Sequence, residues 1–243
     1  MSKFKKEYLV PYFNTDKNGY LRFPNILAYM AETSSWHSDS IGAGIEELVK
    51  RNIGWMLNRW EVKVNKYPRA KDSIFITTWT SGFNKFYATR EFTMEDKEGN
   101  IFALATTQWI LIDMNRKRPI RIPVDFIEKY KRIEEFNFSE FTDFNIIVDD
   151  IEESSNFTVR RSDIDNNNHV NNTKYVDWII EDIKIQTYEN EIIEEFSIIY
   201  KKEILEGSEI NIGKKEVKGE FIHKITTYGD VNAIARTKWK KKD

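Results

Sequence analysis

A short polar segment, residues 160–178, holds the side chains in this sequence that are best suited to chemistry. It contains Asp165, Asn167 and His169, and the apolar pattern of a helix follows at once. A carboxylate and an imidazole can move protons, and an amide beside the N–H groups of a helix start can polarise a carbonyl. The segment therefore predicts a site at a helix N-terminus, although Asp and Asn in this place also serve as ordinary caps.

The composition restricts the kind of protein that carries this segment. The chain has 243 residues, 40% of them hydrophobic, which is enough to bury a core in one large domain or two small ones. Its formal net charge is −2, so nucleic acid is not expected as a partner. The absence of cysteine excludes disulfides, thiolate catalysis and Cys-ligated metals. No run approaches the ~18 apolar residues of a membrane span, and we expect a cytoplasmic protein without membrane insertion.

Hydrophobic periodicity predicts one long helix near the N-terminus and then a set of antiparallel strands. The helix begins at Pro24, which suits a first turn, and ends before Gly42. The strand-like segments are rich in Ile, Val, Thr, Trp and Phe and cover residues 7–13, 53–65, 73–82, 85–95 and 101–113. A short helix that opens at Pro123 and an acidic, aromatic linker complete this half of the chain.

The same order of elements returns in the second half. A strand over 156–161 leads into the polar segment, and a helical pattern follows over about 172–187. Four further strand-like segments close the chain, at 192–202, 208–213, 216–227 and 231–240. A repeated order of strand, long helix and strands predicts two like domains.

The duplication can be aligned by eye, because shifts of 149 and 130 positions superpose similar residues. The first shift places Asp16 on Asp165, and the second places residues 102–109 on residues 232–239. The second copy is therefore the shorter one. This pattern predicts an α+β fold in which each of two antiparallel sheets wraps around its own long helix, the two domains packing as a pseudo-dimer.

The domain limits and the difference between the copies predict different roles for the two domains. We expect residues 1–131 to form an N-terminal domain, 132–152 a surface linker and 153–243 a C-terminal domain. His169 of the second copy faces Tyr20 in the first, so the first copy lacks the imidazole. We therefore expect the C-terminal domain to be catalytic and the N-terminal domain to bind substrate with a degenerate site.

The polar segment resembles the signature of the acyl-acyl carrier protein thioesterases, plant and bacterial enzymes that end the growth of fatty-acyl chains. Two other segments, Trp55–Pro68 and Ala103–Pro123, are similar to further conserved stretches of that family. The resemblance covers nearly the whole chain. It implies a tandem hotdog fold, in which two antiparallel sheets each wrap around a long helix, and this agrees with the duplication.

The resemblance also implies roles for single residues. It marks Asp165, Asn167 and His169 as functional, with Glu203 as a further acidic group. The family's cysteine falls on Ile204, so a cysteine nucleophile is impossible here. We expect Glu203 or Asp165 to activate a water molecule, with His169 assisting. Asn167 and backbone N–H groups at the helix start would polarise the carbonyl, and direct attack by a carboxylate stays open.

The substrate that the resemblance implies is a fatty acyl chain on acyl carrier protein, released as a free fatty acid, with an acyl-CoA thioesterase as the alternative. Apolar residues that suit an acyl site, and equally a core, are Ile26, Met30, Trp55 and Met56. Carrier protein is acidic, and the cations expected to bind it are Arg116, Lys117, Arg118 and Arg121. No cofactor or metal is expected. A monomer could act as its own pseudo-dimer, and a homodimer stays open.

Overall fold

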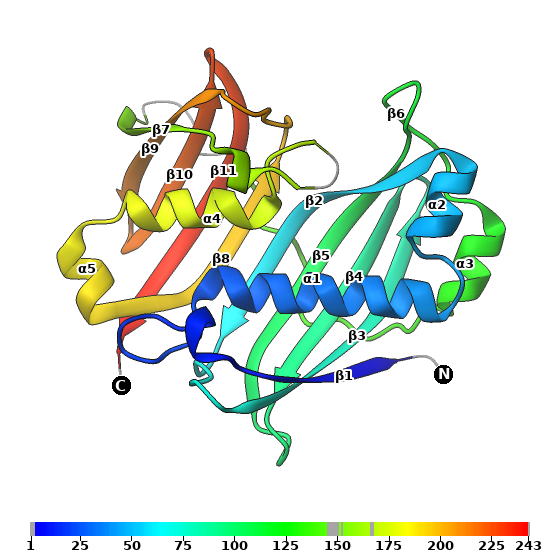
Figure 1. Ribbon diagram of the computed structural model, residues 1–243, viewed down its shortest axis with the longest axis horizontal. Helices are drawn as coiled ribbons and strands as arrows, with labels where there is room; N and C mark the ends of the chain where they lie inside the picture. The colour runs from blue at the N-terminus through cyan, green and yellow to red at the C-terminus, as the bar shows by residue number, and fades with distance from the viewer. Residues whose placement is uncertain (1–2, 145–150, 152, 166–167, 243) are drawn as a thin grey trace. The chain divides into compact units, whose positions relative to one another are not determined.

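The computed structural model describes residues 3–144, 151, 153–165 and 168–242. The chain divides into two compact units. Unit 1 comprises Met1–Asn58 and Val62–Glu140, and unit 2 comprises Arg59–Glu61 and Phe141–Asp243. Each unit has an antiparallel sheet with a helix lying across one of its faces (Figure 1).

Unit 1 contains six strands, three helices and a 3-10 turn. The strands are β1 (Phe4–Leu9), β2 (Ile53–Val64), β3 (Ser73–Asn84), β4 (Tyr87–Glu95), β5 (Ile101–Asp113) and β6 (Arg118–Pro119). The other elements are η1 (Tyr12–Asn14), α1 (Phe23–Ser40), α2 (Ile45–Arg51) and α3 (Val124–Tyr130). The hydrogen-bonded order is β1-β3-β4-β5-β2, with β6 paired to β5. Only the first strand differs clearly from the prediction, because Pro11 ends it and η1 takes up the residues that were expected to continue it.

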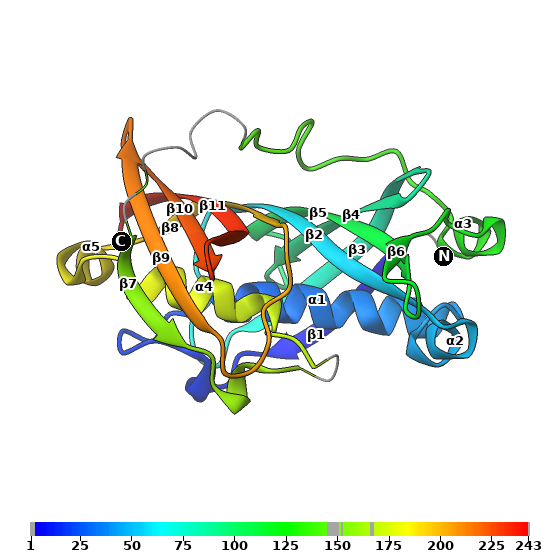
Figure 2. The ribbon, with the colours of Figure 1, turned by 90° about the horizontal axis from the view of Figure 1, so that it is seen from above.

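Helix α1 lies across one face of the unit 1 sheet (Figures 1 and 2). Pro24 occupies its first turn, where the missing N–H has no intrahelical partner to lose, and Gly42 follows its end with φ 66°. Its buried side chains recur every three or four residues: Phe23, Pro24, Ile26, Leu27, Met30, Thr33, Ser34 and His37. None of the helices within the described ranges is long and apolar enough to cross a membrane.

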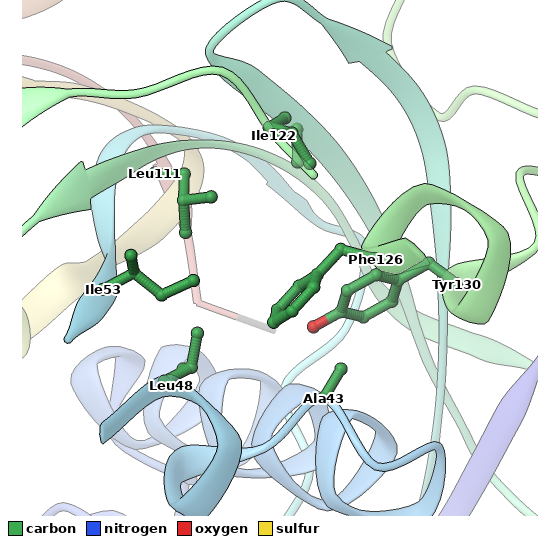
Figure 3. Packing of buried hydrophobic residues seen from close by; sticks show 8 residues of the cluster. Ala43, Leu48, Ile53, Leu111, Ile122, Phe126 and Tyr130 are labelled. Atoms are coloured by element: carbon green, nitrogen blue, oxygen red, sulfur yellow. The ribbon is translucent and has the colours of Figure 1, made fainter. Parts of the chain in front are cut away.

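Helices α2 and α3 cover an apolar cluster at one end of unit 1. Figure 3 shows Leu48 of α2, Ile53 of β2 and Phe126 of α3 pointing toward one another. Arg51 of α2 joins the two helices, because its Nη2 lies 2.7 Å from Oδ2 of Asp125 at the start of α3. The cluster therefore has an apolar interior and an ion pair on its outside.

Unit 2 repeats this plan with fewer residues. Its elements are β7 (Glu153–Thr158), η2 (Arg161–Asp163), α4 (Asn172–Glu181), α5 (Ile185–Asn190), β8 (Glu191–Tyr200), β9 (Glu209–Val217), β10 (Glu220–Thr227) and β11 (Asp230–Lys241). The hydrogen-bonded order is β8-β11-β10-β9-β7, and every pair is antiparallel. The strands expected in the second half are thereby confirmed, most of them to within a few residues.

The expected helix over 172–187 is wrong in its length, because α4 stops at Glu181 and a separate helix, α5, follows. A tertiary contact explains the break. Lys214 of β9 donates from Nζ to the Asp182 backbone carbonyl at 2.6 Å and to its carboxylate at 2.8 Å. The lysine thus takes the carbonyl that the next helical turn would use, and a cation at a helix C-terminus is favourable.

Backbone hydrogen bonds confirm the duplication. The Leu21 N–H donates to the Pro68 carbonyl at 2.8 Å, and 149 positions later the Val170 N–H donates to the Ile204 carbonyl at 3.0 Å. The same shift relates η1 to η2. The acceptors, Pro68 and Ile204, are 136 positions apart. Both copies therefore build the same turn before the helix and dock it on the same loop of the sheet.

The described part of the expected linker is held by two buried carboxylates, one in each unit. Residues 133–140 run along the face of the unit 1 sheet opposite α1 (Figure 2), where the Asn137 N–H donates to Oε2 of Glu91 at 3.1 Å. In unit 2 the Thr142 N–H donates to Oε1 of Glu61 at 2.7 Å. Burial raises the pKa of both Glu61 and Glu91 above the ordinary value.

Candidate functional site

The polar segment forms a tight turn between η2 and α4. The Asp165 N–H donates to the His169 carbonyl at 2.9 Å, and the Asn168 N–H donates to the Asp165 carbonyl at 3.1 Å. Asn168 has φ 62°, a left-handed conformation that asparagine adopts more readily than most residues. The turn therefore fixes the backbone from which Asp165 and His169 project, whereas Asn167 lies outside the described residues.

His169 and Glu203 form a side-chain pair within unit 2. Nε2 of His169 lies 2.9 Å from Oε2 of Glu203, and the two side chains are 24% and 47% exposed, so water reaches both. An ionised carboxylate can only accept, so Nε2 carries the hydrogen, and in the neutral form of the ring Nδ1 keeps a lone pair. A neutral imidazole held by a carboxylate in this way is oriented as a base.

The backbone on both sides of Glu203 is fixed by unit 2. The Ile204 carbonyl accepts from Val170, as described above, and Ile204 is 2% exposed, so it fills the core. Nδ2 of Asn232 lies 3.4 Å from each of the carbonyl oxygens of Lys202 and Glu203. The loop that presents the carboxylate is thus held from two directions.

Two of the backbone N–H groups at the start of α4 are already engaged. The Val170 N–H donates to Ile204, and the Asn171 N–H donates to the Asp163 carbonyl at 2.8 Å. Asn171 is the N-cap, and its Oδ1 accepts from the Thr173 N–H at 2.9 Å. Among the described residues at this helix start, the N–H of Asn172 is the one that keeps no protein acceptor and remains available to polarise a carbonyl.

Tyr175 lies beside Glu203, although the sequence suggested only that it belongs to the apolar side of a helix. Burial, and then the charge of Glu203, raise the pKa of Tyr175 above its ordinary value. The duplication carried a signal for this residue, because the shift of 149 positions places Tyr175 on the apolar Ile26.

The equivalent turn of unit 1 carries different side chains on the same backbone. Tyr20 stands at the position of His169, and Tyr67 at that of Glu203. Their rings are edge to face with centroids 6.4 Å apart, and the guanidinium carbon of Arg69 lies 4.0 Å from the Tyr20 centroid. Two phenols and a guanidinium supply no carboxylate–imidazole pair, so unit 1 lacks this base.

Asp16, the counterpart of Asp165, has a structural role in unit 1. Its Oδ1 accepts from the Asn18 N–H at 2.9 Å and from the Tyr20 N–H at 3.0 Å. An aspartate that accepts from residues two and four positions ahead closes an Asx-type turn. Holding the turn is therefore one task of this Asp position, whatever else Asp165 does in unit 2.

The four residues expected to line an acyl site do not share one surface of unit 1. Ile26 and Met30 are fully buried on α1, toward the sheet. Trp55 of β2 borders the apolar cluster of α2 and α3, and its indole nitrogen is buried without a hydrogen-bond partner. Met56 is 43% exposed and, because side chains alternate along a strand, it lies on the opposite face of β2.

The four cations expected to bind a carrier lie on or next to the β5–β6 hairpin of unit 1, and all are exposed. Asp113 shapes the hairpin turn, since its Oδ1 accepts from the N–H groups of Asn115 and Arg116 at 2.9 Å each. Lys117 has φ 51° in the same turn. The hairpin thus presents Arg116, Lys117 and Arg118 close together in sequence on a defined backbone.

A helix across each of two antiparallel sheets, with a His–Glu pair in the second copy, places the chain among double hotdog proteins. The chain belongs to the acyl-ACP thioesterase family. Residues 1–130 match the family model described as the acyl-ACP thioesterase N-terminal domain, and residues 148–241 match the acyl-ACP thioesterase C-terminal domain. These matches confirm the resemblance seen in the sequence.

Curated relatives of the chain carry matching names. It is 25% identical over 241 residues to the chloroplastic palmitoyl-acyl carrier protein thioesterase of Arabidopsis thaliana, covering 94% of this chain and 58% of the relative. It is 26% identical over 235 residues to the chloroplastic acyl-[acyl-carrier-protein] hydrolase FATB3 of Cuphea viscosissima, covering 87% of this chain and 56% of the relative. The chain therefore spans somewhat more than half the length of these two proteins.

Solved structures share the fold over nearly the whole chain. An acyl-ACP thioesterase from Bacteroides thetaiotaomicron is 23% identical, with a TM-score of 0.89 and coverage of 98% of both chains. The 12:0-ACP thioesterase from Umbellularia californica is 22% identical, with a TM-score of 0.85 and coverage of 100% of this chain and 98% of the other. These likenesses confirm the α+β tandem hotdog fold.

Proposed function

We propose that the protein is a thioester hydrolase that releases a free fatty acid from acyl carrier protein, and so ends fatty acid synthesis in the cytoplasm. The observation that carries the proposal is the 2.9 Å contact between His169 and Glu203 in a chain of the acyl-ACP thioesterase family. The pair joins a turn and a loop that unit 1 builds with other side chains. The names of the relatives support the carrier and the acyl chain as substrate.

The pair acts as the base for water. Glu203 accepts from Nε2 of His169, and Nδ1 accepts a proton as the water oxygen bonds to the thioester carbonyl carbon. The carbon–sulfur bond of the tetrahedral intermediate then breaks. The thiolate of the carrier leaves and takes up the proton from the imidazole, so the products are a fatty acid and a free carrier thiol. A base of this kind contributes about 10²–10⁴-fold to a rate.

The developing oxyanion needs donors that are already in place. The N–H of Asn172, at the positive end of the α4 dipole, is one such donor. The amide of Asn167 is proposed as a second, on the strength of the family signature alone. Asp165 is proposed to hold the turn, as its counterpart Asp16 does in unit 1.

The acyl chain and the carrier are proposed to bind through unit 1. The proposed acyl site follows the buried face of α1 at Ile26 and Met30, with Trp55 and Met56 of β2 as further candidates. The exposed cations Arg116, Lys117 and Arg118 of the β5–β6 hairpin, with Arg121 next to it, suit an acidic carrier protein. The proposed domain limits, at residues 131 and 153, leave the acyl site in the first copy and the base in the second.

The test is a thiol-release assay with two carriers and several acyl lengths. Dodecanoyl- and hexadecanoyl-acyl carrier protein should be hydrolysed with higher kcat/KM than the same acyl groups on CoA, and His169→Ala should abolish both activities. A preference for CoA would favour the alternative, an acyl-CoA thioesterase. Formation of an enoyl product without thiol release would contradict both and indicate a dehydratase.

A further inference from the structure

One strand of each unit holds the loop that leads to the Glu203 position, and it does so through a backbone carbonyl. In unit 2 the Asn232 carbonyl of β11 accepts from the N–H groups of residues 201 and 202, at 2.8 and 3.2 Å. In unit 1 the Phe102 carbonyl of β5 accepts from the N–H groups of residues 65 and 66, also at 2.8 and 3.2 Å. Shifts of 130 and 136 positions relate the acceptors and the donors. The fold therefore builds this loop equally well with an aromatic ring or an amide on the accepting residue.

The side chain of Asn232 makes hydrogen bonds that a phenylalanine cannot make. Its Nδ2 lies 3.4 Å from the carbonyl oxygens of both Lys202 and Glu203. On the other side of the amide, Oγ1 of Thr227 donates to Oδ1 at 2.9 Å. Because carbonyl oxygens only accept, the nitrogen must be the atom that faces the loop, and Oδ1 the atom that faces Thr227. Asn232 and Thr227 are both buried, so the amide is held in one orientation away from water.

The two carbonyls that Nδ2 contacts belong to the two peptide groups that meet at the Cα of Glu203. A peptide group is planar, so holding both planes fixes φ and ψ of Glu203 and with them the direction of its Cα–Cβ bond. The next carbonyl along the chain, that of Ile204, accepts from the Val170 N–H at 3.0 Å. The backbone that directs the carboxylate toward Nε2 of His169 is thus held on both sides of Glu203.

Unit 1 indicates why this amide is needed only in unit 2. Tyr67, the counterpart of Glu203, is 5% exposed, so its own packing holds it in place. The Glu203 side chain is 47% exposed and lacks such packing. A buried amide costs free energy unless it is bonded, and Phe102 shows that the fold does not require one here. The amide therefore gives an exposed carboxylate the fixed backbone that packing gives to Tyr67.

We propose that Asn232 is a positioning residue, whose amide holds the two peptide groups beside Glu203 so that the carboxylate stays in contact with Nε2 of His169. Thr227 keeps the amide in the orientation that this task requires. The effect on turnover rests on the proposed hydrolase function, whereas the effect on the contact does not.

Asn232→Leu tests the proposal, because it keeps a buried side chain of similar size and removes the amide. With dodecanoyl-acyl carrier protein, kcat measured well below Tm should fall about tenfold to a hundredfold while KM stays the same, since a base displaced by about an ångström loses rate rather than binding. Thr227→Val removes only the donor to Oδ1. It should give a smaller loss of the same kind, and it carries the same test if the leucine variant does not fold.

The matched control is Thr237→Val in the same strand. It removes a buried hydroxyl whose oxygen lies 2.9 Å from Nε2 of His223 and 2.9 Å from Nε1 of Trp239. If both variants lower Tm but only Asn232→Leu lowers kcat, positioning is supported. Wild-type kcat in folded Asn232→Leu, or equal losses of kcat in the two variants, would overturn the proposal.

A background without the carboxylate isolates the route through Glu203. In Glu203→Ala no carboxylate is left to direct, so adding Asn232→Leu should change the residual kcat little. A further loss as large as that in the wild-type background would mean that the amide acts by another route, which contradicts the proposal.

The contact itself can be measured without any substrate. In ¹⁵N NMR of the His169 ring, the wild type should show hydrogen on Nε2, whereas Asn232→Leu should populate both tautomers. A crystal structure of the variant should show a longer distance between Nε2 of His169 and Oε2 of Glu203. An unchanged tautomer with an unchanged distance would refute the proposal. A lengthened contact in a protein that hydrolyses no acyl carrier protein thioester would support the positioning role and contradict only the proposed function.

Discussion

The proposed reaction depends on one contact at the residue scale, from Nε2 of His169 to Oε2 of Glu203. A carboxylate against one ring nitrogen decides which nitrogen keeps a lone pair, and so where a proton can go. In unit 1, Tyr20 and Tyr67 occupy the equivalent positions and provide no imidazole nitrogen to accept a proton. The chemistry therefore follows from two side chains and not from the backbone that carries them.

Glu203→Gln tests how much the negative charge at this contact contributes to turnover. The amide oxygen can still accept from Nε2, but without the negative charge the imidazolium that forms is less stable, so kcat should fall at least tenfold. A suitable control is Glu206→Gln, which neutralises an exposed neighbour whose Oε1 lies 3.3 Å from Arg161. Full activity in folded Glu203→Gln would exclude Glu203 from the mechanism.

These residues differ in how well the sequence predicts them, and the differences have physical reasons. Asp165, Asn167 and His169 stand within one turn, where spacing carries information. Glu203 lies in a distant loop, so only the family resemblance pointed to it. Tyr175 shares the period of the apolar helix face, and its place beside Glu203 appears only when the fold brings that distant loop to α4.

Most elements were predictable, because strands and α1 follow their hydrophobic periods closely. The clear failure, the length of α4, came from a contact that no local pattern contains. Asp182 side-chain atoms are 1% exposed, and Lys214 reaches them from β9. A local pattern gives helical propensity over 172–187, whereas the tertiary ion pair decides where the helix ends.

Lys214→Met should destabilise unit 2 strongly. It leaves the Asp182 carboxylate buried without its cation, which costs about 3–5 kcal/mol. Denaturant unfolding measures this loss, and Lys202→Met, which breaks an exposed pair with Asp230, should be close to wild type. Adding Asp182→Asn to Lys214→Met should restore part of the stability. No recovery in the double variant would show that the buried charge is not the cause.

The whole molecule should lose stability in mild acid. Burial lowers the pKa of His37 to about 4 and that of His223 to about 3, whereas both titrate near about 6.5 in an unfolded chain. Between about pH 6.5 and those folded values, the unfolded state binds more protons, so the free energy of unfolding falls as the pH falls. His223→Gln should flatten this dependence in urea unfolding series. An equal slope in the variant would show that His223 does not contribute.

The buried carboxyl groups of Glu61 and Glu91 change the free energy of unfolding with pH in the opposite direction. Because burial raises the folded-state pKa of Glu61 and Glu91, their contribution is fully present below the ordinary glutamate pKa and is lost as the pH rises through the folded values. Glu91→Gln should therefore cost less stability at pH 8 than at pH 5. Equal costs at both pH values would indicate that the carboxyl does not titrate in this range.

Long-range charge provides the last prediction for the whole molecule. Changing Arg116, Lys117, Arg118 and Arg121 to Gln should raise KM for acyl carrier protein substrates and flatten its salt dependence, because attraction to an acidic carrier is screened by salt. An equal change of charge at exposed sites outside this hairpin serves as the control, at Lys97, Lys215, Lys218 and Lys241. If KM moves equally in both variants, the effect is one of net charge alone.

The turn that both copies share has a consequence for protein engineering. Its backbone bonds recur at Leu21 and Val170 whatever the neighbouring side chains are. The same turn therefore tolerates either an aromatic pair, as in unit 1, or an acid–base pair, as in unit 2. In unit 1 this turn carries no acid–base pair. New side chains could be introduced there while the natural pair in unit 2 continues to work.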